Sequence, residues 1–273
     1  MRFSKRLALP AVAALAASVA LVTSARAEDE VWPDIKAAVF EDRAIAEGDG
    51  ALALYAPEQA EDAAVVPVSI HLPAPIANQA KTLTLIVDRN PAPIAATFHF
   101  GDGFRASPDI GERKLATRIR VDSFSNVRAV LETQDGKLHM ATQFVRGAGG
   151  CSAPAGKDAD AALANLGKMK VKTLSNPAFG DKWREAIVMI RHPNFTGMQM
   201  DMETRGYTPA RFINELSVKR GGDLVLSMEG GISISEDPNI RFNYDAGGDE
   251  TLDAHATDTD GAQFSAQSQA GGS

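Results

Sequence analysis

Apolar and polar residues alternate along two long stretches of the chain. In the first stretch, residues 64–146, an apolar side chain recurs at every second position of the segments 65–72, 83–87, 96–100 and 117–121. Such alternation is typical of β-strands with one buried face and one face in water. The pattern therefore predicts several short antiparallel strands, an arrangement that favours a β-sandwich.

The same pattern predicts three hairpins. Asp135-Gly136 separates two alternating runs within residues 126–145, and an aspartate-glycine pair suits a tight turn between antiparallel strands. Alternation resumes over residues 168–264, where residues 219–222 and Asp260-Gly261 separate further runs in the same way. The second stretch is thus also expected to be all-β.

Residues 147–167 lack any period and are rich in Gly, Ala and Pro, which is typical of a flexible linker. We therefore expect an all-β protein with two sandwich domains, residues 64–146 and 168–264, joined by a Gly-rich linker that carries the cysteine. Residues 265–273, SAQSQAGGS, are predicted to be a disordered tail.

The N-terminal residues have the pattern of an export signal. Three basic residues precede an apolar run from Leu7 to Val22, and small residues follow at Ala25 and Ala27. We expect residues 1–27 to be removed on export to the periplasm. The apolar run is short for a bilayer span, so no membrane insertion is expected. Residues 28–63 are predicted to hold a short helix from Pro33 to about residue 40, followed by an extended segment.

The net charge of the chain argues against a nucleic-acid partner. Its formal net charge is −7, and loss of residues 1–27, which contain four basic and no acidic side chains, changes this to −11. An acidic surface repels the phosphates of nucleic acid, so a nucleic-acid partner is not expected.

Cys151 is the single cysteine of the chain, so it can form no internal disulfide. Its neighbours Gly147, Gly149 and Gly150 lack side chains that could pack around the sulfur, which predicts a flexible arm that presents the thiol to solvent. The nearby cation Arg146 would favour the thiolate form. A mobile arm holds no base rigidly beside the thiol, so these residues favour a covalent carrier over a catalytic nucleophile. A passive free thiol and a disulfide-linked dimer remain as alternatives.

At this point the sequence resembles a known pair of families. The segments PVSIHL, ATFHF and 116–145, followed by GAGGCS, resemble SoxY, the sulfur-carrying subunit of the bacterial periplasmic thiosulfate-oxidising system. The segments IRHPNFTGMQMD, RFINELSV and ISEDPNIRFNYDA resemble its partner SoxZ. Their order in one chain is similar to that of the SoxYZ-like carrier proteins associated with quinoprotein dehydrogenases.

The resemblance implies two immunoglobulin-like sandwiches and a sulfur intermediate held on Cys151 as a persulfide or thiosulfonate. It implies no cofactor besides that adduct, and partners among Sox-type enzymes or components of a quinoprotein dehydrogenase system. The chain departs from the families at two places. Ser152-Ala153-Pro154 continue past the cysteine where SoxY ends, and Asn194 follows His-Pro where SoxZ has methionine.

A second hypothesis is a copper-binding module. Met198, Met200 and Met202 alternate, and thioethers bind Cu(I), although methionines that pack against the other domain give the same pattern. The five histidines have no metal-ligand spacing and are expected at the surface. Asp258-Thr259-Asp260-Gly261 is expected to form a turn. The motifs GxSxG, HExxH and CxxC are absent from the sequence, which favours a non-enzymatic role.

Overall fold

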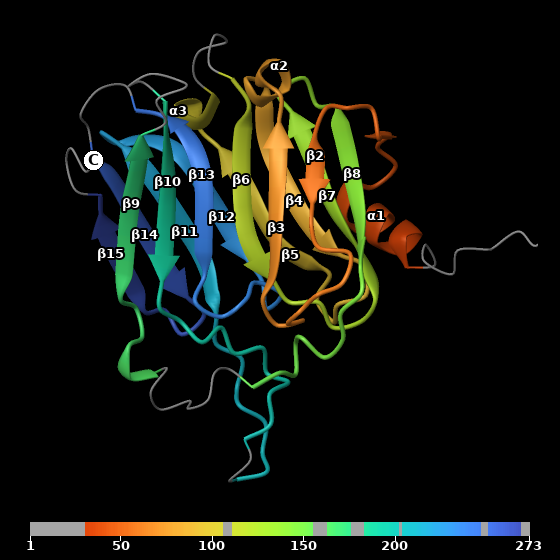
Figure 1. Cartoon of the computed structure of the whole chain (residues 1–273), viewed down its shortest axis with the longest axis vertical. Coiled ribbons are helices and arrows are strands. Elements are labelled where there is room, and N and C mark those ends of the chain that lie inside the picture. The colour runs from red at the N-terminus through yellow and green to blue at the C-terminus, as the bar shows by residue number, and fades with distance from the viewer. Residues whose placement is uncertain are drawn as a thin grey trace, which may run out of the picture.

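The strands of the chain lie in two stacked sheets (Figure 1). The computed structural model describes residues 31–105, 111–154, 163–175, 183–201, 204–246 and 251–268. We call the described residues up to 154 the first half and those from 163 the second half. The export signal predicted at residues 1–27 lies outside the described residues. No helix in the described part of the chain is both long and apolar enough to cross a bilayer.

One sheet has nine strands in the described residues, in the order β1-β8-β7-β4-β5-β12-β11-β14-β15. The bounds of its strands are β1 Ile45–Glu47, β4 Ala80–Val87, β5 Ile94–Phe100, β7 Ser125–Thr133, β8 Leu138–Val145, β11 Ile213–Arg220, β12 Asp223–Gly230, β14 Leu252–Asp258 and β15 Gln263–Gln267.

The other sheet has six strands in the described residues, in the order β2-β3-β6-β13-β10-β9. The bounds of its strands are β2 Ala53–Tyr55, β3 Val66–Leu72, β6 Arg113–Ile119, β9 Met169–Ser175, β10 Trp183–Ile190 and β13 Asn239–Asp245. The helices are α1 Trp32–Phe40, α2 Ala74–Ala77 and α3 Asp102–Arg105.

The all-β prediction is confirmed, and the two halves share both sheets. In one sheet β5 pairs with β12, with Phe98 opposite Met228. In the other, β6 pairs with β13, with Leu115 opposite Phe242. Backbone hydrogen bonds within each of the two sheets therefore join the halves, in addition to the covalent linker.

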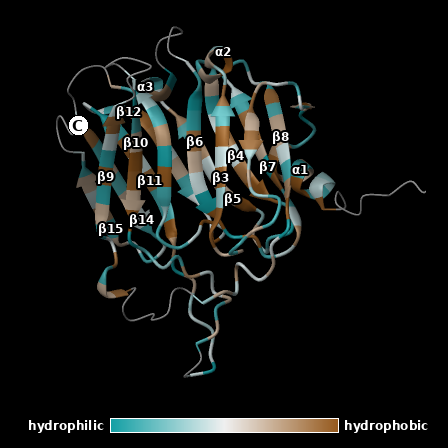
Figure 2. Ribbon diagram, in the orientation of Figure 1, coloured by the Kyte–Doolittle hydropathy of each residue, from teal (hydrophilic) through white to brown (hydrophobic). Residues whose placement is uncertain are grey.

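A single hydrophobic cluster fills the space between the sheets and contains buried residues of both halves, such as Leu85, Phe98, Leu226 and Phe242. Hydrophobic and hydrophilic residues alternate along the strands (Figure 2), because successive side chains point to opposite faces of a sheet. Burial of the apolar face of each strand is the main source of stability for this arrangement.

The helix predicted from Pro33 is confirmed as α1, which packs on the outer face of the nine-stranded sheet. It contributes Phe40 to a second cluster, with Ile86 of β4 and Val130 of β7. This contact corrects the expectation that the strand at 83–87 has one face in water, because α1 and its neighbours bury the outer face of β4 as well.

The three predicted hairpins are confirmed as β7–β8, β11–β12 and β14–β15. Gly136, Gly222 and Gly261 have φ of 82°, 95° and 81°, a backbone region that side chains other than glycine rarely adopt. The disordered tail predicted from residue 265 is wrong for its first residues, because β15 extends to Gln267 and pairs with β14. Ser268 continues the pairing through a bridge to Val171.

Candidate functional site

The segment around Cys151 is folded back on the first half. We call residues 147–154 the Cys turn; it follows β8 at the lower edge of the sandwich in Figure 1. The N–H of Gly149 donates to the carbonyl of Asp122 at 2.8 Å, and the N–H of Gly150 donates to that of Val121 at 3.1 Å. The N–H of Ala153 donates to the carbonyl of Gly149 at 3.0 Å, which closes the turn.

The glycines of the Cys turn permit close packing. A Cβ on Gly150 would lie 2.1 Å from the carbonyl oxygen of Ala63, and a Cβ on Gly147 would lie 3.2 Å from the Cβ of Val121. Gly149 has φ of 74°, which favours glycine for conformational reasons. The open, flexible arm predicted from these three glycines is therefore wrong for the arrangement that the structure shows, because here glycine brings two backbone segments into contact.

Cys151 is buried, and its backbone is hydrogen-bonded to a loop of the second half. We call residues 192–200 the cap loop. The hydroxyl of Thr196 donates to the carbonyl oxygen of Cys151 at 2.6 Å, and the side-chain oxygen of Gln199 accepts a hydrogen bond from the N–H of Thr196 at 2.8 Å. Cys151 is 0% exposed, so the prediction of a solvent-exposed thiol is wrong for this closed arrangement.

Burial and one nearby carboxylate keep the thiol protonated. The N–H of Cys151 donates to Oδ1 of Asp122 at 3.1 Å. Desolvation, with a smaller contribution from the charge of Asp122, raises the pKa of Cys151 to about 12, although Arg120 acts in the opposite direction. Since the thiolate is the nucleophilic form of cysteine, the thiol is unreactive while the cap loop covers it.

Arg120 connects the Cys turn to the cap loop. Its guanidinium donates to the carbonyl of Gly150 at 3.1 Å, and to the carbonyls of Pro193 and Asn194 at 3.5 and 3.4 Å. The side chain is fully buried, and this burial lowers the pKa of Arg120. A buried cation is stabilised by such carbonyl contacts, so Arg120 favours the closed arrangement.

The cation beside the thiol differs from the one expected from sequence. Arg146 was predicted to favour the thiolate, but its guanidinium forms an exposed ion pair with Glu58 at 2.8 Å. The alternating pattern of residues 117–121 predicts that Arg120 faces water, so its burial beside Cys151 could not be predicted from sequence.

Asn194 helps to hold the cap loop on the second half. Its side-chain amide donates to the carbonyl of Ser235 at 3.0 Å, and its amide oxygen accepts from the N–H of Ile213 at 3.1 Å. Its φ of 44° lies in the left-handed region, which asparagine tolerates better than most residues. Asn194 therefore anchors the loop that covers Cys151.

The expectation of surface histidines is wrong for His192, which is buried at the start of the cap loop. Its ring contacts Asp258 at 3.4 Å, and desolvation lowers the pKa of His192. The rings of His71, His99 and His139 form partly exposed pairs with Glu112, Glu229 and Asp49, and His255 is exposed. Within the described residues, no three His, Cys, Asp or Glu side chains gather as a metal site would require.

Two of the three methionines of the copper hypothesis, Met198 and Met200, lie at the far end of the cap loop. Met198 is half-buried, Met200 is 48% exposed and forms a bridge with Tyr207, and Met202 lies outside the described residues. The copper hypothesis remains a prediction. The turn predicted at 258–261 is confirmed, because Oδ1 of Asp258 accepts hydrogen bonds from the N–H groups of Asp260 and Ala262.

Comparisons with known proteins find two family models along the chain. Residues 36–151 match the family described as Sulfur oxidation protein SoxY, and residues 171–269 match the family described as Sulphur oxidation protein SoxZ. The first match ends at Cys151. No curated protein matches the chain. Among solved structures, the sulfur carrier protein SoxY from Chlorobium limicola f thiosulfatophilum is 28% identical over 43% of this chain and 91% of that chain, with a TM-score of 0.31.

Proposed function

We propose a carrier function for this chain, which belongs to the SoxY and SoxZ families of sulfur oxidation proteins, with a SoxY domain followed by a SoxZ domain. In this proposal Cys151 holds a sulfur-containing intermediate covalently while partner enzymes change it. The observation that carries the proposal is that the SoxY match ends at Cys151, the single cysteine of the chain.

Loading requires the Cys turn to leave the cap loop. The closed thiol is inaccessible and its pKa is about 12. Contacts with Thr196, Arg120 and the backbone of Val121 hold the closed state. Local opening of such a short segment needs less free energy than unfolding of the core, and in water the thiol returns to an ordinary pKa of about 8.5. The cap loop thus decides when the thiol can react.

The loading step is a thiol exchange. The thiolate of Cys151 attacks a sulfur–sulfur bond of the donor, a new bond forms between Sγ and the transferred sulfur, and the donor's sulfur–sulfur bond breaks. The leaving sulfur takes the bonding electron pair, so the step needs no additional oxidant. Oxidation or hydrolysis of the bound group is left to partner enzymes, as carriers leave the demanding chemistry to other proteins.

The finer parts of the proposal rest on the sequence. The pattern of residues 1–27 supports export to the periplasm, and the Sox domains support partners among periplasmic sulfur-oxidation enzymes. The order of the two domains in one chain resembles that of SoxYZ-like carrier proteins associated with quinoprotein dehydrogenases. This resemblance motivates an association with a quinoprotein dehydrogenase system. The acidic net charge of −7 disfavours nucleic acid as a partner.

Tetrathionate is a suitable probe because a thiolate displaces thiosulfate from it and keeps the remaining thiosulfonate. We expect intact-mass spectra of the protein to show one thiosulfonate adduct that disappears on reduction, and Cys151→Ser to stay folded and remain unmodified. An equal adduct on Cys151→Ser, or none on the native protein after prolonged incubation at alkaline pH, would contradict the proposal.

Thr196→Val tests the role of the cap loop. This change removes the hydrogen bond to the carbonyl of Cys151 at nearly constant volume. Loss of a bond worth about 1 kcal/mol should raise the open population, and with it the loading rate, about fivefold. Thr142→Val, on β8, is the control because its hydroxyl contacts Glu47 instead. Equal loading rates for the two variants would show that the cap loop does not control the thiol.

A further inference from the structure

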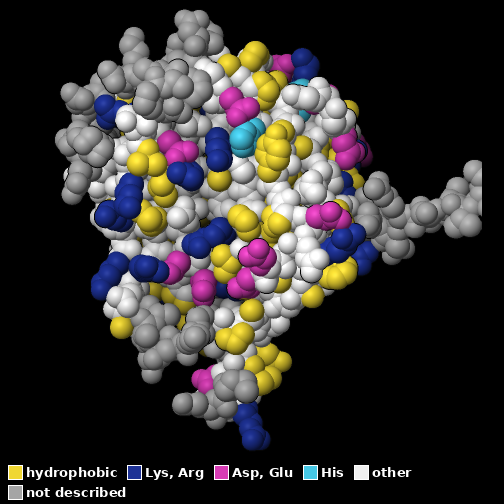
Figure 3. Space-filling view, in the orientation of Figure 1, with side chains coloured by type: hydrophobic (Ala, Val, Ile, Leu, Met, Phe, Trp, Pro, Cys, Tyr) yellow, Lys and Arg dark blue, Asp and Glu magenta, His cyan; other side chains and the backbone are white. Residues whose placement is uncertain are grey.

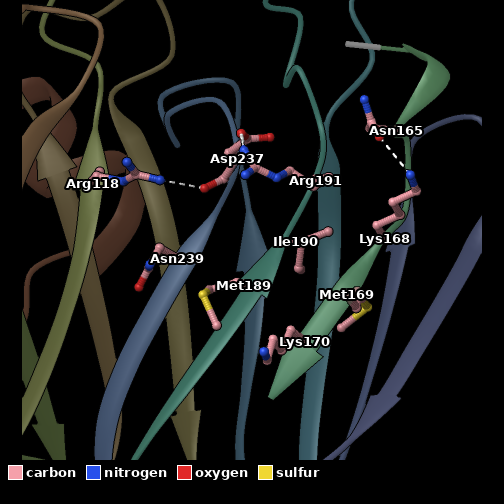
Figure 4. A pocket seen from close by; sticks show the side chains of 10 residues that line it. All are labelled: Arg118, Asn165, Lys168, Met169, Lys170, Met189, Ile190, Arg191, Asp237 and Asn239. Atoms are coloured by element: carbon pink, nitrogen blue, oxygen red, sulfur yellow. Dashed lines mark hydrogen bonds and ion pairs between the residues drawn. The ribbon is translucent and has the colours of Figure 1, made fainter. Parts of the chain in front are cut away.

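A pocket lies on the outer face of the six-stranded sheet, and no residue of the Cys turn lines it. It has a volume of about 480 Å³ and lies where β6 and β10 end and β13 and β9 begin, next to the turn at residues 163–168. The side chains that line it come from all of these segments and face one another across the hollow (Figure 4). Lys and Arg side chains gather over this part of the sheet (Figure 3).

The charge of the pocket is opposite to that of the protein. Its cationic side chains are Arg118, Lys168, Lys170 and Arg191, and Asp237 is the one carboxylate among the described residues that line it. Asp237 forms its ion pair with Arg191. This leaves an excess of positive charge in the pocket of a protein whose formal net charge is −7.

Two of the cationic side chains donate hydrogen bonds to uncharged oxygens. Arg118 donates to the backbone carbonyl of Asp237 at 2.6 Å, and Nζ of Lys168 donates to the side-chain oxygen of Asn165 at 2.7 Å. These contacts orient the two side chains without neutralising them. Glu236 interacts electrostatically with Arg118, but it is half-buried outside the lining of the pocket.

The floor of the pocket is apolar. Met169, Met189 and Ile190 line it between the cations. Methionine is flexible and polarisable, and it adapts to ligands of different shapes. The occupant should therefore carry an apolar group in addition to negative charge.

The size of the pocket excludes a close fit to a small oxyanion. A volume of about 480 Å³ is equivalent to roughly sixteen water molecules at about 30 Å³ each, several times what a tetrahedral anion fills. Four cations from separate segments surround an apolar floor, which suits an extended chain segment with carboxylates on both sides of an apolar side chain.

The pocket is connected to the segments that enclose Cys151. Asp237 accepts a hydrogen bond from the N–H of His192, the first residue of the cap loop, and donates its own N–H to the His192 carbonyl at 2.7 Å. Arg118 precedes Arg120, which contacts the Cys turn, by two positions. A partner bound in the pocket would lie against the base of the cap loop.

We propose that this pocket is a docking site for an acidic segment of a partner protein, in which carboxylates flank an apolar side chain. The electrostatic attraction would direct the partner to the end of the sandwich that holds Cys151. The pocket is independent of thiol chemistry, so the proposal does not require that Cys151 carries sulfur.

The test is binding of a fluorescent peptide, acetyl-Asp-Glu-Leu-Glu-Asp-amide, to the full-length protein. We expect saturable binding that weakens as salt is added, and much weaker binding of the matched peptide acetyl-Asn-Gln-Leu-Gln-Asn-amide. Cys151→Ser should bind the acidic peptide like the native protein, which separates this proposal from the carrier function. Equal binding of both peptides, or no binding of either at low salt, would overturn it.

Two charge-reversal variants locate the site. Lys170→Glu should weaken binding at least about fivefold, since reversal of an exposed charge removes one attraction and adds a repulsion. Lys172→Glu is the matched control, because Lys172 is exposed two positions further along β9 and does not line the pocket. Equal losses for both variants would indicate unspecific attraction and overturn the proposal. Displacement of the peptide by inorganic sulfate at equal concentration would overturn it in favour of a small-anion site.

Discussion

At the scale of single residues, the buried position of Cys151 depends on the absence of a side chain at Gly150. Gly150 allows the backbone to approach the carbonyl of Ala63 so closely that a Cβ would lie 2.1 Å from it. This approach places Cys151 below the cap loop, where the charge of Asp122 and the loss of water hold its thiol in the protonated form. The glycine-rich segment would be mobile as an isolated peptide. In the folded chain the same lack of side chains permits dense packing.

The raised pKa of Cys151 predicts how alkylation depends on pH. In the unfolded chain, the rate of reaction with iodoacetamide should level off above an ordinary thiol pKa of about 8.5. In the native protein, the rate should be lower and should continue to rise about tenfold per pH unit beyond that value, because the closed thiol ionises only near pH 12. Rates measured between pH 7 and 11 with and without urea provide the comparison.

The raised pKa of Cys151 also determines whether the closed state gains or loses stability as pH rises. The closed state binds the thiol proton more tightly than the open state, so its full stability is present below about pH 8.5 and decreases as pH rises toward 12. Since the chain has one cysteine, all of the thiol alkylation reports on this site. A native rate that levels off at the same pH as the unfolded chain would contradict the buried position of the thiol.

Residue-level prediction from sequence succeeded where local chemistry decides and was wrong where distant residues decide. The sequence singled out Cys151, because a lone cysteine is visible in composition alone. It did not indicate Thr196, which lies 45 positions further along the chain and whose hydroxyl bonds to the Cys151 carbonyl. It also favoured Arg146 over Arg120, since proximity in sequence does not reveal which guanidinium is buried beside the thiol.

At the scale of elements, the alternation of side chains predicted most strands, and the turn residues predicted three hairpins. Period two is a local property and specifies the two faces of a strand, but it does not specify which strands pair across the chain. The pairing of β5 with β12 and of β6 with β13 was therefore not predictable from the pattern. These two contacts make the halves parts of shared sheets.

The shared sheets predict that the halves stay together without the linker. A protease site inserted between residues 157 and 158 should be cleaved without separating the fragments, because β5–β12 and β6–β13 hydrogen bonds and the common core remain. Size-exclusion chromatography under native conditions should give one species, and the same sample in urea should give two. The uncleaved insertion variant is the control, and separation of the fragments under native conditions would contradict the shared sheets.

At the scale of the whole molecule, three features lie toward one end of the sandwich. The Cys turn and the cap loop close around Cys151, and the basic pocket adjoins the base of the cap loop through Asp237. Each half contributes to this arrangement: the first supplies the thiol, and the second supplies its cover and most of the pocket. Under the proposed carrier function, the second half would therefore control access to the thiol of the first half.

The measurement that tests the central claim most directly is the intact mass of the protein isolated, without reductant, from the cells that make it. Covalent transport on Cys151 predicts a fraction of molecules with added sulfur-containing mass, located at Cys151 by peptide mapping and removed by reduction. A chain that carries only an unmodified thiol, in cells that are actively oxidising sulfur compounds, would contradict the account.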